Sequence, residues 1–364
     1  MANARSIHTK RWVNELSARG HEIHLITQHG EKMGYNEKIP IHVLPFGSAK
    51  GYVLNAWTLR RILSKLKPDL LNAHYASGYG TLATLSGFRP RAISVWGADV
   101  FDFPFRSFLC WKLIVCNLQR ADAVLSTSEV MARHVETKLS CADCDLTVTP
   151  FGVDVSMFTS HPKAPKDEIV IGTVKTLDKK YGIDVLIKAF ALANKKNDLP
   201  SGGCSRPMRL VIVGGGPERE RLIALAYELG IREMTTFVGD IDHKDVPSFL
   251  KQMDIFVAVS RLDSESFGVS VVEASACGLP VIVSRVGGLP EVVSEGGSGL
   301  IVPKNDEEAT AAAITRLADD PSLREEMGKK GRQMMMEKYD WRENVTTMEK
   351  AYHRIIEKRC MTCR

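Results

Sequence analysis

The sequence predicts an α/β protein built from doubly wound, Rossmann-like domains. Short and almost continuous apolar runs recur along the chain, and the segments between them have the spacing of amphipathic helices. The runs are residues 22–27, 92–96, 123–126, 169–172, 210–213, 255–259 and 280–283. Apolar strands that alternate with helices are typical of parallel sheets covered on both faces. A length of 364 residues suits two such domains, which we expect to face each other across a cleft.

The composition sets the class of protein and excludes others. With 44% hydrophobic and 25% charged residues it is ordinary for a soluble globular protein, and no apolar run approaches the length of about 18 residues that predicts a membrane span. The first five residues lack the pattern of a signal peptide, so we expect a cytoplasmic protein. The net charge of +5 is too diffuse to indicate nucleic acid binding, although it allows weak attraction to anionic substrates or lipid headgroups.

The first predicted elements are a helix over residues 6–20 and a strand over residues 22–27. A doubly wound domain normally begins with a strand, and no apolar run precedes this helix. We therefore expect that the first strand of this domain is missing or that the start of the chain is truncated. The strands at 92–96 and 123–126 continue the same domain.

Two segments of the first half combine basic with apolar residues. Residues 59–67 have apolar positions at helical spacing, which indicates either a solvated helix face or a surface that docks on a membrane. Residues 105–115 mix aromatic and basic side chains, which fits either core packing or contact with a bilayer interface. The sequence leaves both alternatives open and makes peripheral membrane contact a hypothesis.

The boundary between the domains is predicted near residues 149–158, followed by a polar, proline-containing stretch over 161–168. We expect an N-terminal domain over residues 1–152 and a second domain over 153–340, with the linker as a hinge. Residues 341–364 are expected to form a terminal helix that packs back on the first domain. Residues 194–206 have the composition of a surface loop inside the second domain.

Four of the eight cysteines form two C-x-x-C pairs, Cys141 with Cys144 and Cys360 with Cys363. Two such pairs provide a four-thiolate zinc site if they meet in space. Free thiols are the simpler interpretation, because neither pair is flanked by glycine-rich turns and a disulfide is disfavoured in a reducing cytosol. Both interpretations stay open at this stage.

The second domain opens with a strand over residues 169–172 and a loop that carries Lys175, Lys179 and Lys180. This loop follows the carboxyl end of a strand, where open α/β sheets bind their ligands. Ammonium groups there can neutralise a diphosphate, although lysines in loops are usually solvated. The next turn is Gly-Gly-Gly-Pro at 214–217, where Gly215 either lets a ligand approach the backbone or only tightens a strand-to-helix turn.

Two carboxylates, Glu265 and Glu273, lie eight positions apart around the start of a predicted helix. At about 1.5 Å of rise per residue they span roughly 12 Å, and the free N–H groups of the helix start lie between them. A diphosphate can rest on those amides, so one acid can bind a sugar and the other a ribose. Structural roles for both acids are the alternative.

Together with residues 240–245, 274–283 and Gly-Gly-Leu-Pro-Glu at 287–291, these features resemble the donor domain of the family 4 glycosyltransferases, known as glycosyl transferases group 1. The resemblance runs from residue 150 through 341 and implies the GT-B fold. It also implies a retaining transfer, without a metal ion or other cofactor, from a nucleoside diphosphate sugar. The expected donor is a UDP- or GDP-linked hexose or N-acetylhexosamine.

The family resemblance also implies residue roles. Glu265 is expected to hold a donor-sugar hydroxyl and Glu273 the ribose hydroxyls, while Lys175 and Lys180 contact the diphosphate. The backbone of Phe267, Gly268 and Val269 is expected to bind another phosphate oxygen. No metal ligand is expected, because the D-x-D patterns at 143–145 and 240–242 are better explained as solvated loops.

The first domain matches the family more loosely, at residues 6–12, 68–74, 94–99 and 121–128. Trp96 stands where many family members have a histidine that touches the donor sugar. Tryptophan cannot accept a proton, so it stacks on a ring or packs in the core. His74 is a candidate substitute, with a structural role as the favoured alternative.

The sequence therefore predicts a glycosyltransferase that acts at the cytoplasmic face of a membrane on a lipid-linked or polysaccharide acceptor, in cell-envelope glycan synthesis. Two other functions stay open. A nucleotide-sugar epimerase of the same architecture would turn over donor without an acceptor, and a non-catalytic protein would bind the nucleotide sugar without turnover.

Overall fold

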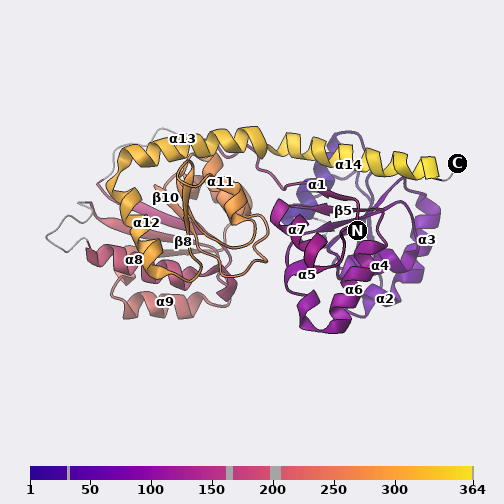
Figure 1. Ribbon diagram of the computed structural model, residues 1–364, viewed down its shortest axis with the longest axis horizontal. Coiled ribbons are helices and arrows are strands. Elements are labelled where there is room, and N and C mark those ends of the chain that lie inside the picture. Colours follow the sequence, from indigo (N-terminus) through magenta and orange to yellow (C-terminus); the bar gives the residue numbers. More distant parts are fainter. Residues whose placement is uncertain (31–32, 161–166, 197–205, 363–364) are drawn as a thin grey trace. The chain divides into compact units, whose positions relative to one another are not determined.

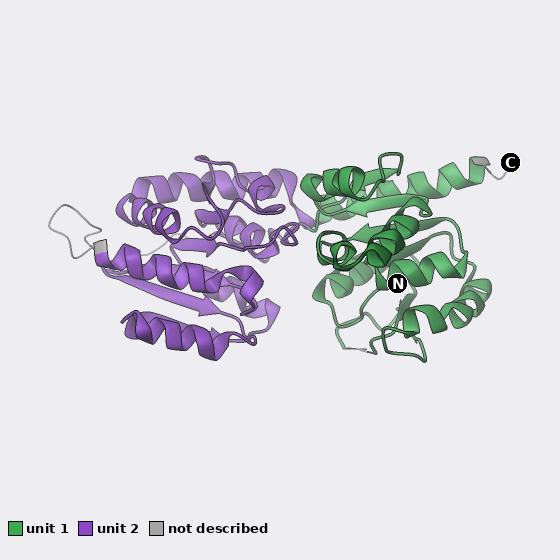
Figure 2. Cartoon of the chain, turned by 60° about the horizontal axis from the view of Figure 1, so that its bottom comes forward, with its two compact units in different colours: residues 1–151, 342–364 green, residues 152–341 purple. Residues whose placement is uncertain are grey.

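The computed structural model describes residues 1–30, 33–160, 167–196 and 206–362. The chain forms two compact units (Figure 2). Unit 1 comprises Met1–Phe151 and Arg342–Arg364, and unit 2 comprises Gly152–Trp341. Most of the expected surface loop at 194–206 and of the polar stretch at 161–168 lies outside the described residues.

Unit 2 is built on a six-stranded parallel sheet of order β12-β11-β10-β7-β8-β9. Its strands are β7 (Ile169–Val174), β8 (Met208–Val213), β9 (Thr235–Gly239), β10 (Ile255–Ala258), β11 (Val281–Ser284) and β12 (Gly299–Val302). Its helices are α8 (Ile183–Lys196), α9 (Arg219–Glu228), α10 (Val246–Leu250), α11 (Val269–Ala276), α12 (Glu307–Asp319) and α13 (Pro321–Lys338). Strand β10 is apolar throughout and β11 is apolar up to its last residue, Ser284, and both are buried, as expected for a parallel sheet with both faces covered. Figure 1 shows helices on both sides of these strands.

Short 3-10 turns shape several loops of the molecule: η1 (Pro104–Arg106), η2 (Lys179–Tyr181), η3 (Arg232–Met234), η4 (His243–Asp245) and η5 (Leu289–Val292). Of these, η2, η4 and η5 follow the carboxyl ends of β7, β9 and β11. They therefore belong to the edge of the sheet where open α/β folds bind ligands.

Unit 1 has a parallel sheet of order β3-β4-β5-β6 and a separate parallel pair, β1 with β2. The strands are β1 (Leu25–Thr27), β2 (Ile41–Val43), β3 (Leu71–His74), β4 (Arg91–Val95), β5 (Ala123–Ser126) and β6 (Leu146–Val148). The helices are α1 (Ile7–Ala18), α2 (Gly51–Leu54), α3 (Ala56–Leu66), α4 (Gly78–Ser86), α5 (Ala98–Phe101), α6 (Phe108–Gln119), α7 (Glu129–Lys138) and α14 (Trp341–Thr362).

The first residues of the chain lie where the sequence predicted that the first strand of unit 1 is missing. The carbonyl of Met1 accepts a hydrogen bond of 2.9 Å from the N–H of His74, and the N–H of Ala2 donates over 3.2 Å to the carbonyl of Ile26. Residues 1–2 therefore connect β3 to β1 by backbone hydrogen bonds, although they are not a regular strand. The Met1 ammonium is buried, which lowers its pKa to about 5.

Helix α14 is fastened to the rest of unit 1 by polar contacts along its length. Glu349 accepts a hydrogen bond of 2.7 Å from Arg19 and contacts His21 over 2.8 Å. Asn72, on β3, donates to the hydroxyl of Tyr352 over 2.7 Å. Near the end of the helix, Lys358 pairs with Asp145 over 3.1 Å. These contacts explain why residues 342–364 cluster with the N-terminal half of the chain.

The cysteine prediction needs a correction. Cys141 and Cys144 form a disulfide in the turn before β6, with Cα atoms 5.2 Å apart, whereas the sequence favoured free thiols. The spacing permits this bond because the turn brings the two residues together, with the N–H of Cys144 donating to the carbonyl of Cys141. Cys360 is a free thiol, and Cys363 lies outside the described residues. Among the described residues, no cluster of three or more His, Cys, Asp or Glu side chains has a geometry that fits a metal ion.

The two mixed basic and apolar segments are helices that are only partly buried. On α3, Leu59 and Leu63 face the core, while Trp57 is 65% exposed. The start of α6 exposes Phe108 and Leu109 by 70% and 76%, and its second half is buried. Within the part of the chain that the structure describes, no helix is both long and apolar enough to cross a membrane.

Candidate functional site

The predicted donor residues gather at one edge of the sheet of unit 2. Lys175 follows β7, Gly215 follows β8, the segment of His243 follows β9, and Glu265 follows β10. Parallel strands end on the same side, so loops that are far apart in the sequence meet there. The apolar strands fix the position of each loop, and the loops carry the polar side chains.

Glu265 and Lys175 are bonded to each other. The Lys175 ammonium donates to a Glu265 carboxylate oxygen over 2.8 Å, and the two side chains are only 12% and 10% exposed. Ser260 adds a longer hydrogen bond of 3.4 Å to the same oxygen. The sequence predicted separate partners for the two residues, a phosphate for the lysine and a sugar hydroxyl for the acid. The structure shows that they also neutralise each other.

Tyr181 positions two of the predicted lysines. The ammonium groups of Lys175 and Lys180 lie 4.5 and 4.7 Å from the centre of its ring. Burial lowers the pKa of Lys180, but Tyr181, Asp178 and Glu265 outweigh it and raise that pKa above its ordinary value. Lys180 is therefore a permanent cation at this edge of the sheet. Lys179 is exposed, and its carbonyl accepts a hydrogen bond from Arg261.

Helix α11 begins between the two acids, as predicted. Gly268 precedes it with a φ of 80°, and a side chain there would lie 2.5 Å from Leu289, so the position requires glycine. Phe267 is buried, and Val269 is the first residue of the helix. Ser270, in the first turn, was not predicted. Its hydroxyl is buried and has no hydrogen-bond partner among the described residues.

Glu273 lies in the second turn of α11 with its side chain 5% exposed. One of its oxygens is 2.7 Å from the Nε2 atom of His243, which comes from η4. No role was predicted for His243, because only the folded chain brings η4 and α11 together. A buried carboxylate needs such a partner, since an unpaired buried charge is costly.

The glycine turn after β8 packs against the lysine loop. A side chain at Gly214 would lie 2.0 Å from the carbonyl oxygen of Lys175, so this position requires glycine for a close backbone approach. The N–H of Gly215 donates to Asp240 over 2.8 Å. The sequence left open whether Gly215 lets a ligand approach the backbone or only tightens a turn; its N–H already has a protein partner, and the glycines serve at least to pack two loops together.

A second glycine pair supports the loop of Glu265. The N–H of Gly288 donates over 3.0 Å to the carbonyl of Glu265, and the N–H of Gly287 donates over 3.0 Å to Asp263. A side chain at Gly288 would lie 2.0 Å from the carbonyl oxygen of Ser266. The sequence analysis identified Gly287 and Gly288 as part of the family motif, and the structure shows that they hold the loop of Glu265 by backbone hydrogen bonds.

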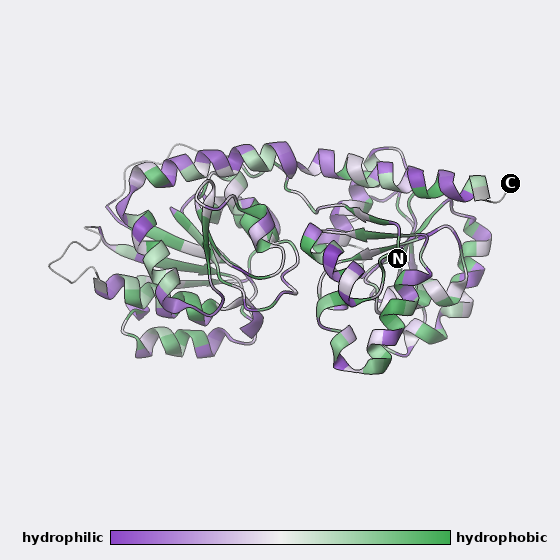
Figure 3. Cartoon of the chain, in the orientation of Figure 1, coloured by the Kyte–Doolittle hydropathy of each residue, from purple (hydrophilic) through white to green (hydrophobic). Residues whose placement is uncertain are grey.

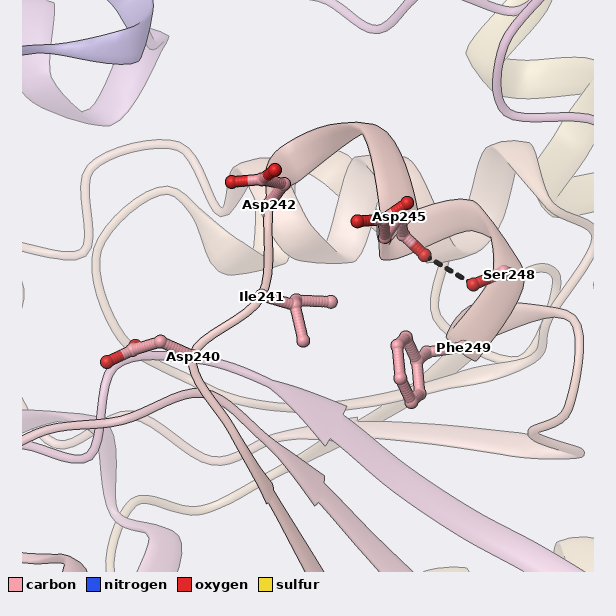
Figure 4. A pocket seen from close by; sticks show the side chains of 6 residues that line it. All are labelled: Asp240, Ile241, Asp242, Asp245, Ser248 and Phe249. Atoms are coloured by element: carbon pink, nitrogen blue, oxygen red, sulfur yellow. Dashed lines mark hydrogen bonds between the residues drawn. The ribbon is translucent and has the colours of Figure 1, made fainter.

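A hollow of about 580 Å³ lies beside η4 (Figure 4). It is lined by Asp240, Ile241, Asp242, Asp245, Ser248 and Phe249. The first two acids form one of the D-x-D patterns, and they have different partners: Asp240 accepts from Gly215, while Asp242 pairs with Lys244 over 3.5 Å. The hollow adjoins the segment that carries His243.

In unit 1, Trp96 packs among aromatic rings. Its ring lies edge-on to those of His74, Tyr75 and Phe151, with centres 4.8 to 5.4 Å apart. His74 is buried, and burial followed by the nearby Met1 ammonium lowers its pKa to about 3, so it is neutral. This packing favours the structural alternative for both residues. Buried Asp99 orders the same turn by accepting hydrogen bonds from three backbone N–H groups.

Comparison with known proteins gives two family matches. The model described as glycosyl transferases group 1 matches residues 158–334, and the model described as glycosyl transferase 4-like matches residues 1–128. The two matched segments together cover most of the chain and fall in different units.

Curated relatives match over different lengths. A GDP-mannose-dependent alpha-(1-6)-phosphatidylinositol monomannoside mannosyltransferase of Mycolicibacterium smegmatis is 33% identical over 53% of this chain and 52% of its own length. The capsular polysaccharide biosynthesis glycosyltransferase CapM of Staphylococcus aureus is 25% identical over 94% of this chain and 92% of its own. The matched part of the chain thus spans about half the length of the mannosyltransferase.

Solved structures share the fold. Sucrose-phosphate synthase from Thermosynechococcus elongatus superposes with a TM-score of 0.84 at 22% identity, covering 98% of this chain and 94% of that one. HepE of Anabaena, solved in complex with UDP-glucose, gives a TM-score of 0.75 at 17% identity, covering 98% and 97%. At these identities the likeness concerns the fold alone.

Proposed function

We propose that this chain, which belongs to the group 1 family of glycosyltransferases with the GT-B fold, transfers a sugar from a nucleoside diphosphate sugar to an acceptor with retention of configuration. The observation that carries the proposal is the Lys175–Glu265 pair, which lies with Lys180 and the start of α11 at one edge of the unit 2 sheet. This arrangement provides groups for a sugar, a diphosphate and a ribose in that order.

In the proposed complex, a hydroxyl of the nucleotide sugar donates a hydrogen bond to Glu265. The ammonium of Lys175 then pairs with the diphosphate in place of Glu265. Lys180 supplies the second positive charge, and the N–H groups at the start of α11 bind another phosphate oxygen. The unpartnered hydroxyl of Ser270 is placed in the same first turn and can donate to that phosphate. Glu273 accepts the ribose hydroxyls. The proposed site takes no metal ion or other cofactor.

The proposed reaction breaks the bond between the anomeric carbon and the phosphate oxygen and forms a bond from that carbon to the acceptor oxygen on the same face. The acceptor hydroxyl gives its proton to the departing phosphate. Lys175, Lys180 and the helix amides stabilise the negative charge that develops on the diphosphate, which is where electrostatic stabilisation lowers the barrier most.

The carrier of the sugar is proposed to be UDP or GDP. The mycolicibacterial relative is named for its use of GDP-mannose, and the HepE structure holds UDP-glucose, so related proteins use both nucleotides. The hollow beside η4 is lined by the segment that also carries His243, and we propose it as the space for the nucleobase. The transferred group is proposed to be a hexosyl or N-acetylhexosaminyl unit.

The acceptor is proposed to be a lipid-linked or polysaccharide glycan of the cell envelope, met at the cytoplasmic face of a membrane. A part of unit 1 that combines exposed apolar with basic residues supports peripheral contact, and Figure 3 shows hydrophobic stretches in the helices of that unit. Its exposed apolar residues are Phe46, Val53, Leu54, Trp57, Phe105, Phe108 and Leu109. The two segments that hold them, residues 38–68 and 103–121, contain no aspartate or glutamate. Positive charge beside exposed aromatic rings fits a surface of anionic lipid.

The decisive experiment measures both nucleotide binding and sugar transfer. Wild type is screened against UDP-, GDP- and ADP-sugars by thermal shift, because a ligand that binds only the folded state raises its stability. Glu265→Gln and Glu273→Gln are then assayed for transfer, with exposed Glu308→Gln as the matched control. We expect both site variants to lose at least about tenfold in kcat/KM. Unchanged transfer by either variant contradicts the proposal.

The same assay separates the alternatives. Turnover of the donor to an isomer without an acceptor identifies an epimerase, and tight nucleotide-sugar binding without any turnover identifies a non-catalytic binding protein.

A further inference from the structure

We propose that His243 is a positioning residue, which holds the carboxylate of Glu273 in the orientation that binds the ribose of the donor. The inference rests on the proposed function and adds to it a residue from another loop. His243 acts through Glu273, so its effect appears in the affinity for the nucleotide and not in the chemical step.

The contact between His243 and Glu273 joins two separate elements of the site, η4 and α11. Glu273 is on α11 and is nearly buried, with 5% of its side chain exposed, while His243 is on η4, after β9, with 32% exposed. Their atoms Oε1 and Nε2 are 2.7 Å apart, a strong hydrogen bond to a charged group. Among the described contacts of Glu273, this is the one made by another side chain.

The histidine is itself held in place. Its ring lies 5.7 Å from the ring of Phe158, which is 1% exposed and therefore fixed by the packing around it. One side of His243 thus rests on a rigid aromatic residue, while its Nε2 atom faces the acid. This arrangement selects one orientation of the imidazole and, through it, one orientation of the carboxylate.

The chemistry explains why Glu273 needs a hydrogen-bond donor beside it. With Nε2 protonated, His243 donates to one oxygen of Glu273, and the other oxygen stays available as an acceptor. Ribose hydroxyls donate, so a fixed carboxylate oxygen is a suitable partner for them. Without His243 the buried carboxylate loses its partner and turns towards other donors or takes up a proton, and either change weakens the ribose contact.

Two variants separate the hydrogen bond from the packing. His243→Phe keeps a ring against Phe158 and removes the donor, whereas His243→Gln loses the ring and keeps an N–H donor at the end of a side chain of similar reach. We expect His243→Phe to raise the Kd for UDP or GDP, whichever the wild type binds, by about 10- to 100-fold, the range of a hydrogen bond to a charged group. His243→Gln should stay within about threefold of wild type by the same criterion.

Steady-state kinetics gives a second readout. Because the ribose contact is the same before and during the reaction, the KM for the donor should rise in His243→Phe while kcat changes less than about threefold. The double variant His243→Phe with Glu273→Gln should bind nucleotide no more weakly than Glu273→Gln alone, because both changes remove one interaction. Thermal unfolding of each variant shows whether unit 2 is intact.

The outcomes separate a failure of the role of His243 from a failure of the proposed function. Normal nucleotide binding by His243→Phe overturns the role of His243, and so does additivity in the double variant. If His243→Gln binds as weakly as His243→Phe, the ring and not the donor matters, and the inference is also overturned. If Glu273→Gln weakens binding while His243→Phe does not, the proposed function stands and only this inference fails. If Glu273→Gln binds normally, the proposed function itself fails.

Discussion

Replacing Gly288 with alanine tests how closely the loop of Glu265 must be held. The φ of Gly288 is −84°, an angle that any residue adopts, so the substitution introduces no backbone strain of its own. The new methyl group would instead lie 2.0 Å from the carbonyl oxygen of Ser266, where ordinary contact begins at 3.4 Å. The carbonyl belongs to the backbone and the position of the methyl group is fixed by the backbone, so neither can rotate away.

The expected magnitude follows from that distance. The segment from Glu265 to Phe267 has to retreat by about 1.4 Å to restore an ordinary contact, and a misplacement of about 1 Å already costs about 100-fold in rate at a reacting centre. Overpacking of a tight contact lowers the free energy of unfolding by about 1 to 3 kcal/mol. We therefore expect Gly288→Ala to remain folded while its kcat/KM for sugar transfer falls by about two orders of magnitude.

The matched control is Gly331→Ala on α13 in the same unit. There the added methyl group would lie 3.5 Å from the Cβ atom of Ser298, an ordinary contact, and alanine in a helix adds up to about 1 kcal/mol of stability. The assay compares kcat/KM and urea unfolding of both variants with wild type. Transfer by Gly288→Ala at the rate of Gly331→Ala would refute the argument that this backbone contact positions Glu265.

Three further predictions concern unit 1. Wild type should sediment with vesicles that contain phosphatidylglycerol and not with neutral vesicles, and Trp57→Glu should abolish this binding while Tyr227→Glu, exposed on unit 2, leaves it unchanged. Asp99→Ala should lower the free energy of unfolding of unit 1 by about 3 kcal/mol, because three backbone N–H groups lose their acceptor. Tryptophan fluorescence can follow the unfolding of this unit, since the tryptophans at positions 12, 57, 96 and 111 lie in it. Burial raises the pKa of Glu349, but hydrogen bonds from His21 and Arg19 outweigh it and lower that pKa below 4.5, so the stabilisation is complete above that pH and is lost as pH falls through the lowered value. Glu349→Gln should remove this acid dependence from urea unfolding of unit 1.

Most of unit 2 could be predicted from local patterns. Strands β7, β8, β10 and β11 occur where apolar runs predict them, whereas β9 and β12 were not predicted. Glycine at 268 and the acids on either side of it define the start of α11 without reference to any distant residue. Signals of this kind depend on neighbours in the chain, and a parallel sheet then gathers the loops at one edge whatever their order.

Contacts between distant segments escaped the same reasoning. His243 and Glu273 are thirty positions apart and meet only because the fold brings η4, which follows β9, to α11, so no spacing in the sequence indicates their bond. Residues 1–2 have no apolar run, yet their backbone joins β3 to β1. The disulfide of Cys141 depends on the tightness of one turn, which the composition of the C-x-x-C motif leaves undetermined.

The bond between Lys175 and Glu265 gives each side chain a partner of opposite charge before a donor binds. A lone lysine or a lone carboxylate at about 10% exposure would be destabilised by the loss of water, and each now supplies the other's counter-charge. A nucleotide sugar brings its own matched pair, a hydroxyl that donates to the acid and a phosphate that accepts from the lysine. Donor binding then exchanges one internal ion pair for two contacts with the ligand, so neither group is left buried without a partner at any stage. An uncharged sugar without the diphosphate cannot make this exchange, because it would separate Lys175 from Glu265 and give the ammonium no anion in return. We therefore predict that the pair selects for the complete nucleotide sugar over the free sugar.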